Sequence, residues 1–481
     1  MTAQKFSGIF TDRGVPLVVD LDGTLIKSDL LHEGLFMLIK KNPIIFFQYL
    51  VWLLKGKVYF KKQLFKLVHL KYHLLPFNQE ILSFLQQESE SGRQIVMATA
   101  SLTTVADKVA EVHPLFSKVY GTEEINLKGV NKANLLLEEF GQSKFDYIGN
   151  SVADIPVFIC ARYSYIVRPS RALKRKARKI AGVKYIWNSS QSVWDFIKAI
   201  RVYQWLKNLL IFIPVITSHQ FFSAAILSKT LAAFFAFSFI ASAGYIFNDI
   251  ADLNSDRGHP KKKFRPLASG KISLPAGVIL MACFLLSGLI IAFQLNLYFL
   301  ISLLVYLAIS ISYSFFFKKL VLYDVFILTV LYSSRIIAGG LVTGIIISSW
   351  LIAFSTFIFI SLAFVKRYSE LMKVDKESGL KERRRGYVPN DLIFLQTMGI
   401  GSGLVSTVVF SLYIDSPDVI LLYKHPKLLW ITSLFFLFWI SHIWIITSRG
   451  RMTDDPIIFS VKDPTSYIVF AIILSIMFLA T

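Results

Sequence analysis

The sequence predicts a protein of two parts: an N-terminal α/β domain of Rossmann-like type and a C-terminal all-α bundle that crosses a membrane about nine times. The first part is indicated by apolar, β-branched runs that end in acidic or hydroxyl side chains, as buried parallel strands do where a sheet carries its site. The second part is indicated by a succession of apolar segments from residue 206 onward. We expect an α/β domain over residues 1–190, a basic, amphipathic linker over 191–205 and a membrane domain over 206–481.

The chain is strongly positive, with 52 Lys and Arg against 31 Asp and Glu and a formal net charge of +21. These cations stand in short segments beside apolar runs, as in cytoplasmic loops of membrane proteins, so we interpret the charge as a membrane feature rather than a nucleic-acid surface. Cys160 and Cys283 are far apart in sequence and indicate neither a disulfide framework nor a zinc site. Residues 1–16 do not read as a cleavable signal peptide, so we expect the N-terminus in the cytosol.

Four segments of the first part place polar side chains at or near the ends of apolar runs or at the start of a helix. Leu17–Leu25 reads LVVDLDGTL, a buried strand that ends in Asp20 and Asp22. The other three are the strand Ile95–Thr99, a helical stretch opened by Lys132, and the segment Tyr147–Ser151, which leads to Asp154.

The string DLDGTL resembles motif I of the haloacid dehalogenase superfamily, and the later segments are similar to its motifs II, III and IV. The resemblance implies that Asp20 is a nucleophile forming an aspartyl-phosphate, that Asp22 is the general acid/base, and that Thr99 and Lys132 hold phosphoryl oxygens. It also implies a bound Mg²⁺, with these ligands: Asp20, Asp22, Asn150 and Asp154. Asn150 stands where a second acid is common, which predicts weaker Mg²⁺ binding. A retained fold without activity is the alternative.

An insertion of helical character, about residues 28–90, stands where that family carries its cap. Within it Pro43–Leu54 reads PIIFFQYLVWLL, which is too short to span a bilayer and is followed by lysines. Such a segment either lies in the headgroup plane or packs against the other cap helices, and its periodicity does not separate the two. The later basic run Arg171–Lys179 predicts a solvated helix face near anionic lipid.

The stretch Asn248–Gly270, NDIADLNSDRGHPKKKFRPLASG, crowds acids and cations together at the end of an apolar run. Asn248, Asp252 and Asp256 are spaced four residues apart, and Asp249 directly follows Asn248. On a helix these four side chains would line one stripe. Such carboxylates repel one another without a cation, and Mg²⁺ shared with a diphosphate suits them. The cations that follow add phosphate donors: Arg257, Lys261, Lys262, Lys263 and Arg265. A basic loop that only sets topology would account for the lysines but not for the aspartates.

NDxxDxxxD followed by RPxxSG resembles the first Asp-rich motif of the UbiA superfamily of intramembrane prenyltransferases. The wording DRGHPKKKFRPLASG is closer to the polyprenyl-phosphate (decaprenyl-phosphate) phosphoribosyltransferase branch than to the RTxxRP of aromatic-acceptor members. Further motifs agree: Gln204–Asn208, Tyr313–Ser314 with Lys318 and Asp324, Arg335 followed by Ala338–Gly340, and Lys366–Tyr368. The resemblance covers about Arg201 to the C-terminus.

This second resemblance implies a site in which the catalytic carboxylates and Mg²⁺ ligands are Asp249, Asp252 and Asp256. It implies a substrate-binding set as well: Asn248, Arg257, Lys261, Lys263, Arg265, Lys207, Tyr313, Lys318, Asp324, Arg335, Lys366 and Arg367. An aspartate at a span boundary is often only interfacial, but charges near hydrocarbon are costly and tend to face a cavity. Arg335, beside residues that allow close helix approach, would place a positive charge inside the bundle, which suits a phosphate.

Nine apolar segments follow Leu206, the first of marginal length: about 206–219, 228–247, 276–293, 296–316, 322–342, 349–365, 391–413, 428–447 and 464–480. Basic residues concentrate in alternate loops, among them Lys318–Lys319, Arg383–Arg385 and Arg449–Lys462. The positive-inside rule then places the α/β domain and every candidate catalytic loop in the cytosol and the C-terminus outside. We expect a multi-pass protein of a bacterial inner membrane.

Together these features predict a bifunctional, Mg²⁺-dependent enzyme. Its membrane part would move 5-phosphoribosyl from phosphoribosyl diphosphate to polyprenyl phosphate, and its soluble part would remove the 5-phosphate of the lipid product. The first alternative is a UbiA-type prenyltransferase that moves a prenyl group from prenyl diphosphate to an aromatic or other acceptor, with an accessory phosphatase domain. The second is a transporter or lipid-binding protein, which clustered cytosolic aspartates fit poorly. The expected partners are these substrates and the bilayer, with downstream lipid-sugar enzymes as further candidates and no nucleic acid.

Overall fold

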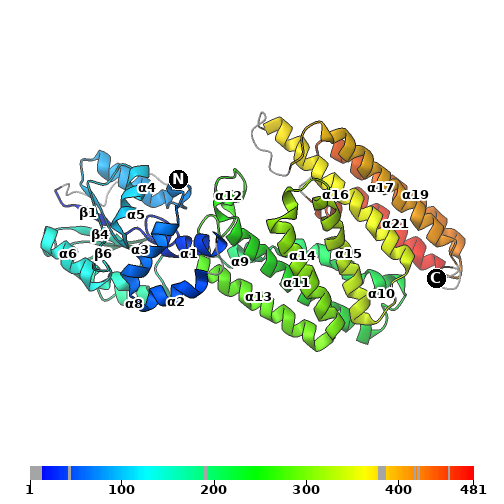
Figure 1. Cartoon of the computed structure of the whole chain (residues 1–481), viewed down its shortest axis with the longest axis horizontal. Coiled ribbons are helices and arrows are strands. Elements are labelled where there is room, and N and C mark those ends of the chain that lie inside the picture. Colours follow the sequence, from blue (N-terminus) through cyan, green and yellow to red (C-terminus); the bar gives the residue numbers. More distant parts are fainter. Residues whose placement is uncertain are drawn as a thin grey trace. The chain divides into compact units, whose positions relative to one another are not determined.

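The computed structural model describes residues 14–41, 45–180, 182–187, 192–377, 386–416, 419, 423–452 and 455–481. These residues form two compact units (Figure 1): unit 1 holds the residues up to Ala199 together with Ile246–Leu280, and unit 2 holds Ile200–Tyr245 together with Met281–Thr481. Three features singled out in the sequence lie outside the described residues: Arg383–Arg385, the first two residues of Pro43–Leu54, and Gln191 at the start of the expected linker.

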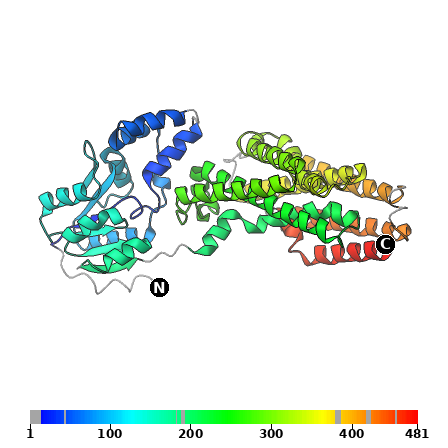
Figure 2. The ribbon, with the colours of Figure 1, turned by 90° about the horizontal axis from the view of Figure 1, so that it is seen from below.

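Unit 1 is built on a six-stranded parallel sheet with the strand order β3-β2-β1-β4-β5-β6, flanked by helices (Figure 2). The strands are β1 (Leu17–Val19), β2 (Ile95–Leu102), β3 (Lys118–Thr122), β4 (Asp146–Gly149), β5 (Ser164–Val167) and β6 (Val183–Trp187). The chain winds outward from β1 in both directions, so the strand order reverses between β1 and β4, where open α/β sheets place their sites. The predicted parallel α/β sheet is confirmed.

The two faces of the sheet are covered by different helices because successive side chains of a strand point to opposite faces. Leu17 and Val19 of β1 enter one core, and Val18 enters the other. The first core contains residues of α4 (Gln79–Glu90) and α5 (Thr103–Val112), and the second contains residues of α6 (Val130–Phe140), α7 (Ile155–Cys160) and α8 (Arg171–Ala177).

The helical insertion begins after Ile26, whose bridge to Phe77 brings the chain back to the sheet. Its helices are α1 (Leu30–Lys41), α2 (Phe46–Leu54) and α3 (Lys57–Leu67), followed by the short 3₁₀ turn η3 (Tyr72–Leu74). In α2, Tyr49 packs edge-on against Phe60 of α3 with ring centroids 6.0 Å apart, while Val51, Leu53 and Leu54 are exposed. One face of this segment is therefore buried in the insertion and the other is bare.

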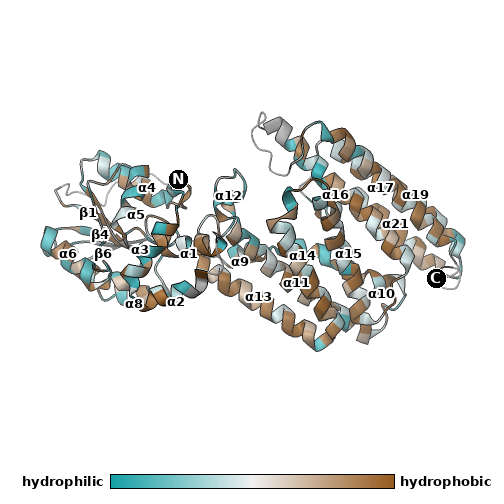
Figure 3. Cartoon of the chain, viewed as in Figure 1, coloured by the Kyte–Doolittle hydropathy of each residue, from teal (hydrophilic) through white to brown (hydrophobic). Residues whose placement is uncertain are grey.

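Among the described residues, seven helices are long and apolar enough to cross a membrane, and Figure 3 shows that apolar residues cover most of their length. They are α11 (Ala224–Ala251), α13 (Leu274–Leu295), α14 (Leu297–Phe315), α15 (Tyr323–Thr343), α16 (Ser349–Glu377), α17 (Asp391–Ile414), and α19 (Leu429–Ser448) with the 3₁₀ turn η8 (Pro426–Leu428) before it. The protein is therefore an integral membrane protein whose spanning part is helical.

The prediction of about nine spans is wrong: the described residues give seven, or eight if one bent pair of helices counts as a span. The first predicted segment is a 3₁₀ stretch, η5 (Val202–Phe212), with α10 (Ile213–Thr217) after it, and the path bends by 45° after α9 (Val193–Ile200). The last segment is α21 (Pro464–Ala480), whose 17 residues rise only about 26 Å against a hydrocarbon core of about 30 Å. Hydropathy alone does not reveal the break, whereas the short length of the last segment was already present in its predicted bounds, 464–480.

Within unit 2 the small residues of α15 allow a close approach, as predicted. A Cβ at Gly339 would lie 2.1 Å from the carbonyl oxygen of Ile211 in η5, so only glycine fits there. Ile211 and Ala338 belong to the same buried cluster as Phe237 of α11. This contact brings η5 against the α15 turn that carries Arg335.

Candidate functional site

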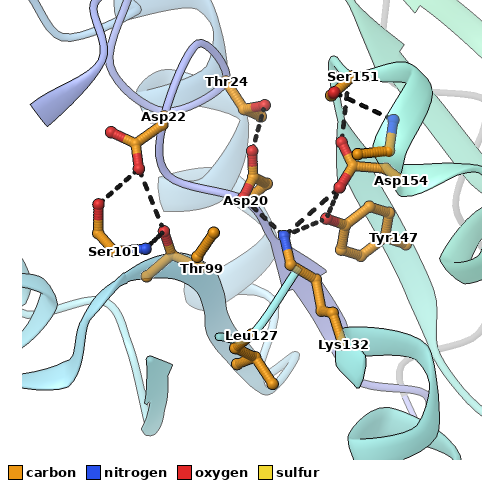
Figure 4. A network of polar contacts seen from close by, with 12 residues as sticks. Asp20, Asp22, Thr24, Thr99, Ser101, Leu127, Lys132, Tyr147, Ser151 and Asp154 are labelled. Atoms are coloured by element: carbon orange, nitrogen blue, oxygen red, sulfur yellow. Dashed lines mark hydrogen bonds and ion pairs between the residues drawn. The ribbon is translucent and has the colours of Figure 1, made fainter. Parts of the chain in front are cut away.

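Asp20 and Lys132 meet at the carboxyl edge of the sheet in unit 1 (Figure 4). Asp20 directly follows β1, and the Lys132 ammonium on α6 donates to its Oδ1 over 2.8 Å. The same ammonium donates to the Tyr147 hydroxyl over 3.0 Å and lies 3.5 Å from Asp154 Oδ1. All four side chains are buried, so a cation and two carboxylates share a pocket from which most water is excluded.

Asp22 lies on the opposite side of Asp20 from Lys132 and has its own partners (Figure 4). Its carboxylate accepts hydrogen bonds from Ser101 Oγ at 2.7 Å, Thr99 Oγ1 at 3.4 Å and the backbone N–H of Leu30 at 2.8 Å. Gly23 makes the turn with φ of 77°, where a Cβ would lie 2.0 Å from Asn150 Nδ2. This glycine therefore lets the first loop close against the loop after β4.

The electrostatics of this edge favour protonated carboxyl groups. Burial raises the pKa of Asp20 to about 6 despite the nearby Lys132, and the charge of Asp154 adds to the rise. Burial, helped by the charge of Asp29, raises the pKa of Asp22 to about 7. Burial alone would lower the pKa of Lys132, but Asp20 and Asp154 hold it above its usual value. A carboxyl with a pKa near 7 is suited to giving and taking protons at neutral pH.

The predicted Mg²⁺ ligands of this site meet only in part. Asp20 and Asp154 share the Lys132 ammonium, whereas Asp22 is held by hydroxyl groups and Asn150 lies against Gly23. Across the described ranges, no group of three or more His, Cys, Asp or Glu side chains is arranged to hold a metal ion. Carboxylate and amide oxygens are nevertheless the donors that Mg²⁺ prefers, so the chemistry of the set fits this ion.

The Asp-rich stretch, also in unit 1, keeps its predicted spacing although its helix is interrupted. α11 ends at Ala251 and α12 (Leu253–Arg257) begins after Asp252. The backbone N–H of Asp252 still donates to the carbonyl of Asn248 over 2.8 Å, and the N–H of Asp256 donates to that of Asp252 over 2.8 Å. The side chains at steps of four therefore remain on one stripe.

Arg265 joins two of these aspartates through one guanidinium nitrogen. Its Nη1 donates to Asp249 Oδ1 over 3.0 Å and to Asp256 Oδ2 over 2.6 Å. Both carboxylates are buried, while Asn248 and Asp252 are half-buried. The positive charge between the two carboxylates occupies the position expected of a shared cation, so the donor set suits Mg²⁺ with a diphosphate here too.

The other cations of this stretch divide into two groups. Arg257 is buried and gives its fork to Glu33 of α1, over 3.0 and 2.6 Å, while its Nε donates to the carbonyl of Ala268 over 3.0 Å. This pairing satisfies the side chain without a phosphate. Lys261 and Lys263, beside the 3₁₀ turn η6 (Lys262–Phe264), are exposed.

Unit 2 contains a separate cluster of buried charges around Asp455. Lys207 of η5 pairs directly with Asp455, and Lys366 of α16 lies 3.7 Å from the same carboxylate. Asp455 also caps α20 (Pro456–Ser460) by accepting from the N–H of Ile457 over 3.2 Å. Two of the predicted phosphate-binding lysines therefore share one carboxylate.

Arg335 lies inside the bundle of unit 2, as predicted, and is surrounded by polar and aromatic groups. Its Nε donates to Asn208 Oδ1 over 2.8 Å and its Nη2 donates to the Tyr306 hydroxyl over 3.2 Å. The guanidinium also lies 5.1 Å from the ring centroid of Phe237. Its Nη1 donates to the carbonyl of Leu331, so all three guanidinium nitrogens have neutral partners that fix the orientation of the side chain.

Arg367 and Asp324 form a buried ion pair elsewhere in unit 2. Arg367 also donates to the Tyr313 hydroxyl over 2.8 Å and pairs with Glu370, and the Tyr387 hydroxyl donates to Asp324 over 2.8 Å. Lys318, in the 3₁₀ turn η7 (Phe317–Lys319), is half-buried. Three predicted substrate-binding residues, Tyr313, Asp324 and Arg367, are thus brought together in one network of hydrogen bonds and ion pairs.

Sequence analysis did not predict several residues of these clusters. Ser101 stands two residues beyond Thr99 on the same strand, a spacing that returns to the same face and could have indicated it. Asp455 precedes Pro456, a start signal for a helix, but nothing local pairs it with Lys207. Glu33 and Tyr387 carry no motif at all.

Comparison with known proteins places the helical part of the chain in a family. Residues 210–459 match the model of the UbiA prenyltransferase family. The chain is 35% identical to the uncharacterized protein y4nM of Sinorhizobium fredii, over 96% of this chain and 90% of that protein. It is 31% identical to the decaprenyl-phosphate phosphoribosyltransferase of Mycolicibacterium smegmatis, over 47% of this chain and 72% of the relative. A UbiA homolog from Archaeoglobus fulgidus, solved bound to GPP and Mg²⁺, aligns at 17% identity with a TM-score of 0.45, over 60% of this chain and 99% of that one.

Proposed function

Because the chain belongs to the UbiA prenyltransferase family, we propose that its membrane part is a transferase that moves 5-phosphoribosyl from phosphoribosyl diphosphate to polyprenyl phosphate. The wording HPKKKFRPLASG and the likeness to decaprenyl-phosphate phosphoribosyltransferases support this donor over a prenyl diphosphate. The observation that carries the proposal is the pair of buried carboxylates, Asp249 and Asp256, held together by one cation. A diphosphate leaving group needs a site where carboxylates hold a cation that neutralises its negative charge.

In the proposed transfer, an oxygen of the polyprenyl phosphate attacks the anomeric carbon of the ribose. The bond from that carbon to the diphosphate breaks, and diphosphate leaves with both electrons. Asp249, Asp252 and Asp256 would hold Mg²⁺, which neutralises charge on the departing diphosphate when bound. Lys261 and Lys263 are exposed cations of the same stretch that could contact phosphate oxygens. In unit 2, the buried cations Arg335 and Lys207 and the half-buried Lys366 are proposed for substrate phosphates.

We propose further that the sheet edge of unit 1 removes the 5-phosphate of the lipid product. Asp20 would attack phosphorus while the bond to the ribose oxygen breaks, and Asp22 would give that oxygen its proton. A water would then attack the aspartyl-phosphate, with Asp22 taking the proton, to release inorganic phosphate and restore Asp20. Asp20, Asp154 and Asn150 would hold Mg²⁺, which supplies positive charge to the phosphoryl oxygens, and Lys132 adds a fixed cation beside the nucleophile.

The orientation of the chain is part of the proposal. Basic residues follow the ends of α14, α16 and α19, and the Asp-rich stretch follows α11, so these ends would face the cytosol of a bacterial inner membrane together with unit 1.

The test is incubation of the full-length chain in detergent with labelled phosphoribosyl diphosphate, polyprenyl phosphate and Mg²⁺. Label should enter the lipid fraction only when all three are present, and mass spectrometry should find the product without its 5-phosphate. Labelling of an aromatic acid by a prenyl diphosphate would instead favour the prenyltransferase alternative.

A further inference from the structure

A cavity of about 320 Å³ opens beside Asp22 in unit 1. Part of its wall comes from the proposed phosphatase site, through Asp22 and Asn150. Another part comes from Leu274 and Pro275, which begin α13, a helix apolar enough to cross a membrane. The cavity therefore joins a phosphoryl site to the first turn of an apolar helix, and its volume is that of a small-molecule site.

Two cations, Lys27 and Arg168, line the same cavity. Arg168 follows β5, at the sheet edge that also carries Asp20, and it holds a left-handed φ of 46° that is rare outside glycine. Its guanidinium donates to the backbone carbonyls of Lys27, Gly270 and Lys271 over 3.2 to 3.4 Å. These three acceptors are neutral carbonyl groups, and they leave donors of the five-donor guanidinium for a further acceptor.

The position of Lys27 is fixed by the end of the Asp-rich stretch. A Cβ at Gly270 would lie 2.6 Å from Lys27 Cβ, and Gly270 has φ of 68°, so the backbone there sits directly on Lys27. Burial, with the neighbouring charge of Arg168, lowers the pKa of the Lys27 ammonium. Glu80 opposes this shift in part, and Asp22 and Asp29 also line the cavity. An anion bound beside Lys27 and Arg168 would lower the cost of holding two like charges in one half-buried wall.

We propose that Lys27 and Arg168 bind the phosphodiester of a lipid-linked sugar phosphate whose terminal phosphomonoester occupies the site at Asp20. The apolar wall of Leu274 and Pro275 then receives the start of the lipid chain. This inference rests on the phosphatase function proposed above and adds the groups that bind the rest of its substrate: two cations for the phosphodiester and an apolar wall for the lipid chain, neither of which a soluble monophosphate would use.

The test measures phosphate release by the full-length chain in detergent with Mg²⁺ on three phosphomonoesters. They are a short-chain prenyl-phosphoryl ribose 5-phosphate, the matching methyl-phosphoryl ribose 5-phosphate, and para-nitrophenyl phosphate. Lys27→Gln and Arg168→Gln should lower the ratio of kcat/KM for the prenyl diester to kcat/KM for para-nitrophenyl phosphate by about 10-fold or more, through a higher KM. Lys27→Arg should keep the wild-type ratio, and Lys144→Gln, which changes an exposed lysine two residues before β4, should not alter it.

Each result decides the inference. An unchanged ratio in Lys27→Gln, with an active wild type, overturns the subsite alone and leaves the phosphatase proposal standing. If the wild type turns over the methyl diester as well as the prenyl diester, the lipid-chain wall is refuted. Absence of phosphate release from all three substrates by the wild type overturns both the subsite and the phosphatase function.

Discussion

Glu33 and Arg257, which are 224 residues apart in sequence, form a buried two-pronged ion pair in unit 1 with N–O distances of 3.0 and 2.6 Å. Glu33 lies in α1 of the helical insertion. Arg257 is the last residue of α12 and directly follows Asp256, the third of the three aspartates. Lys40 of the same insertion helix also donates to the carbonyl of Ala251. The insertion therefore holds the segment that carries Asp252 and Asp256.

Removal of one partner of this pair should be strongly destabilising, because the other charge would stay buried without compensation. We expect Glu33→Gln to cost about 3–5 kcal/mol of the stability of unit 1, and the double variant with Arg257→Gln to cost less than the sum of the singles. Thermal inactivation of phosphate release measures this. Glu139→Gln, which breaks the exposed pair with Lys118, should cost less than about 1 kcal/mol. Additive effects of the two buried substitutions would contradict the coupling.

The contrast between Arg257 and Arg265 shows where sequence reasoning ends. Both were predicted to bind phosphate, but tertiary packing brings Arg257 against Glu33 and leaves Arg265 between Asp249 and Asp256. A charge pattern along the chain cannot reveal a partner 224 residues away. The span count failed for a related reason, because apolarity does not distinguish a continuous helix from the 3₁₀ stretch Val202–Phe212.

The sheet edge was easier to predict because parallel strands bring their carboxyl ends to one place. Asp20, Lys132 and Asp154 therefore meet although they are far apart in sequence. The motifs did not predict the hydrogen-bond partners of Asp22. Ser101 and the N–H of Leu30 hold this side chain away from Lys132. Leu30 depends on the fold of the insertion, which carries no motif, whereas Ser101 lies on β2 two residues beyond Thr99.

The Asp-rich stretch should be required for transfer and not for folding. Asp252 is half-buried, and its backbone N–H and carbonyl groups take part in the hydrogen bonds that keep the helical spacing. We expect Asp252→Asn to reduce incorporation of labelled phosphoribosyl into lipid by about 100-fold or more, because a metal ligand loses its charge. Ser255→Ala, an exposed neighbour, is the matched control and should keep wild-type incorporation. Normal turnover in Asp252→Asn, with the same elution profile in detergent, would falsify the assignment.

Substitution of Asp20 should stop the proposed phosphatase reaction and leave the proposed transfer reaction unchanged. Asp20→Asn removes the nucleophile of the second reaction and leaves the Asp-rich stretch intact, so transfer should continue and the phosphorylated lipid should accumulate. Mass spectrometry of the lipid extract distinguishes the products by one phosphate group. Identical products from the wild type and Asp20→Asn would show that unit 1 is not the phosphatase for this lipid.

The sheet-edge site should bind Mg²⁺ more tightly as the pH rises. Burial raises the pKa of Asp20 to about 6 and that of Asp22 to about 7, so at pH 6 protons compete with the ion for these carboxyl groups, and at pH 8 they do not. Without Mg²⁺, raising the pH has the opposite effect: it lowers the stability of the folded state. Since both folded-state pKa values lie above those of the unfolded chain, the folded state holds more protons between about pH 4 and 7, and stability falls as pH rises through that window.

The measurement is the thermal unfolding midpoint of the full-length chain in detergent, with and without Mg²⁺, at pH 6 and pH 8. The measurement is made on the Asp252→Asn variant, which lacks a proposed ligand of the Mg²⁺ site in the Asp-rich stretch. The change in midpoint caused by Mg²⁺ then comes from the site at the sheet edge. We expect the Mg²⁺-induced increase in midpoint to be larger at pH 8, because the gain from a ligand grows with its affinity. Asp20→Asn in the same background should reduce both the increase and its pH dependence. An equal increase at both pH values would show that the raised pKa of these carboxyls does not control metal binding.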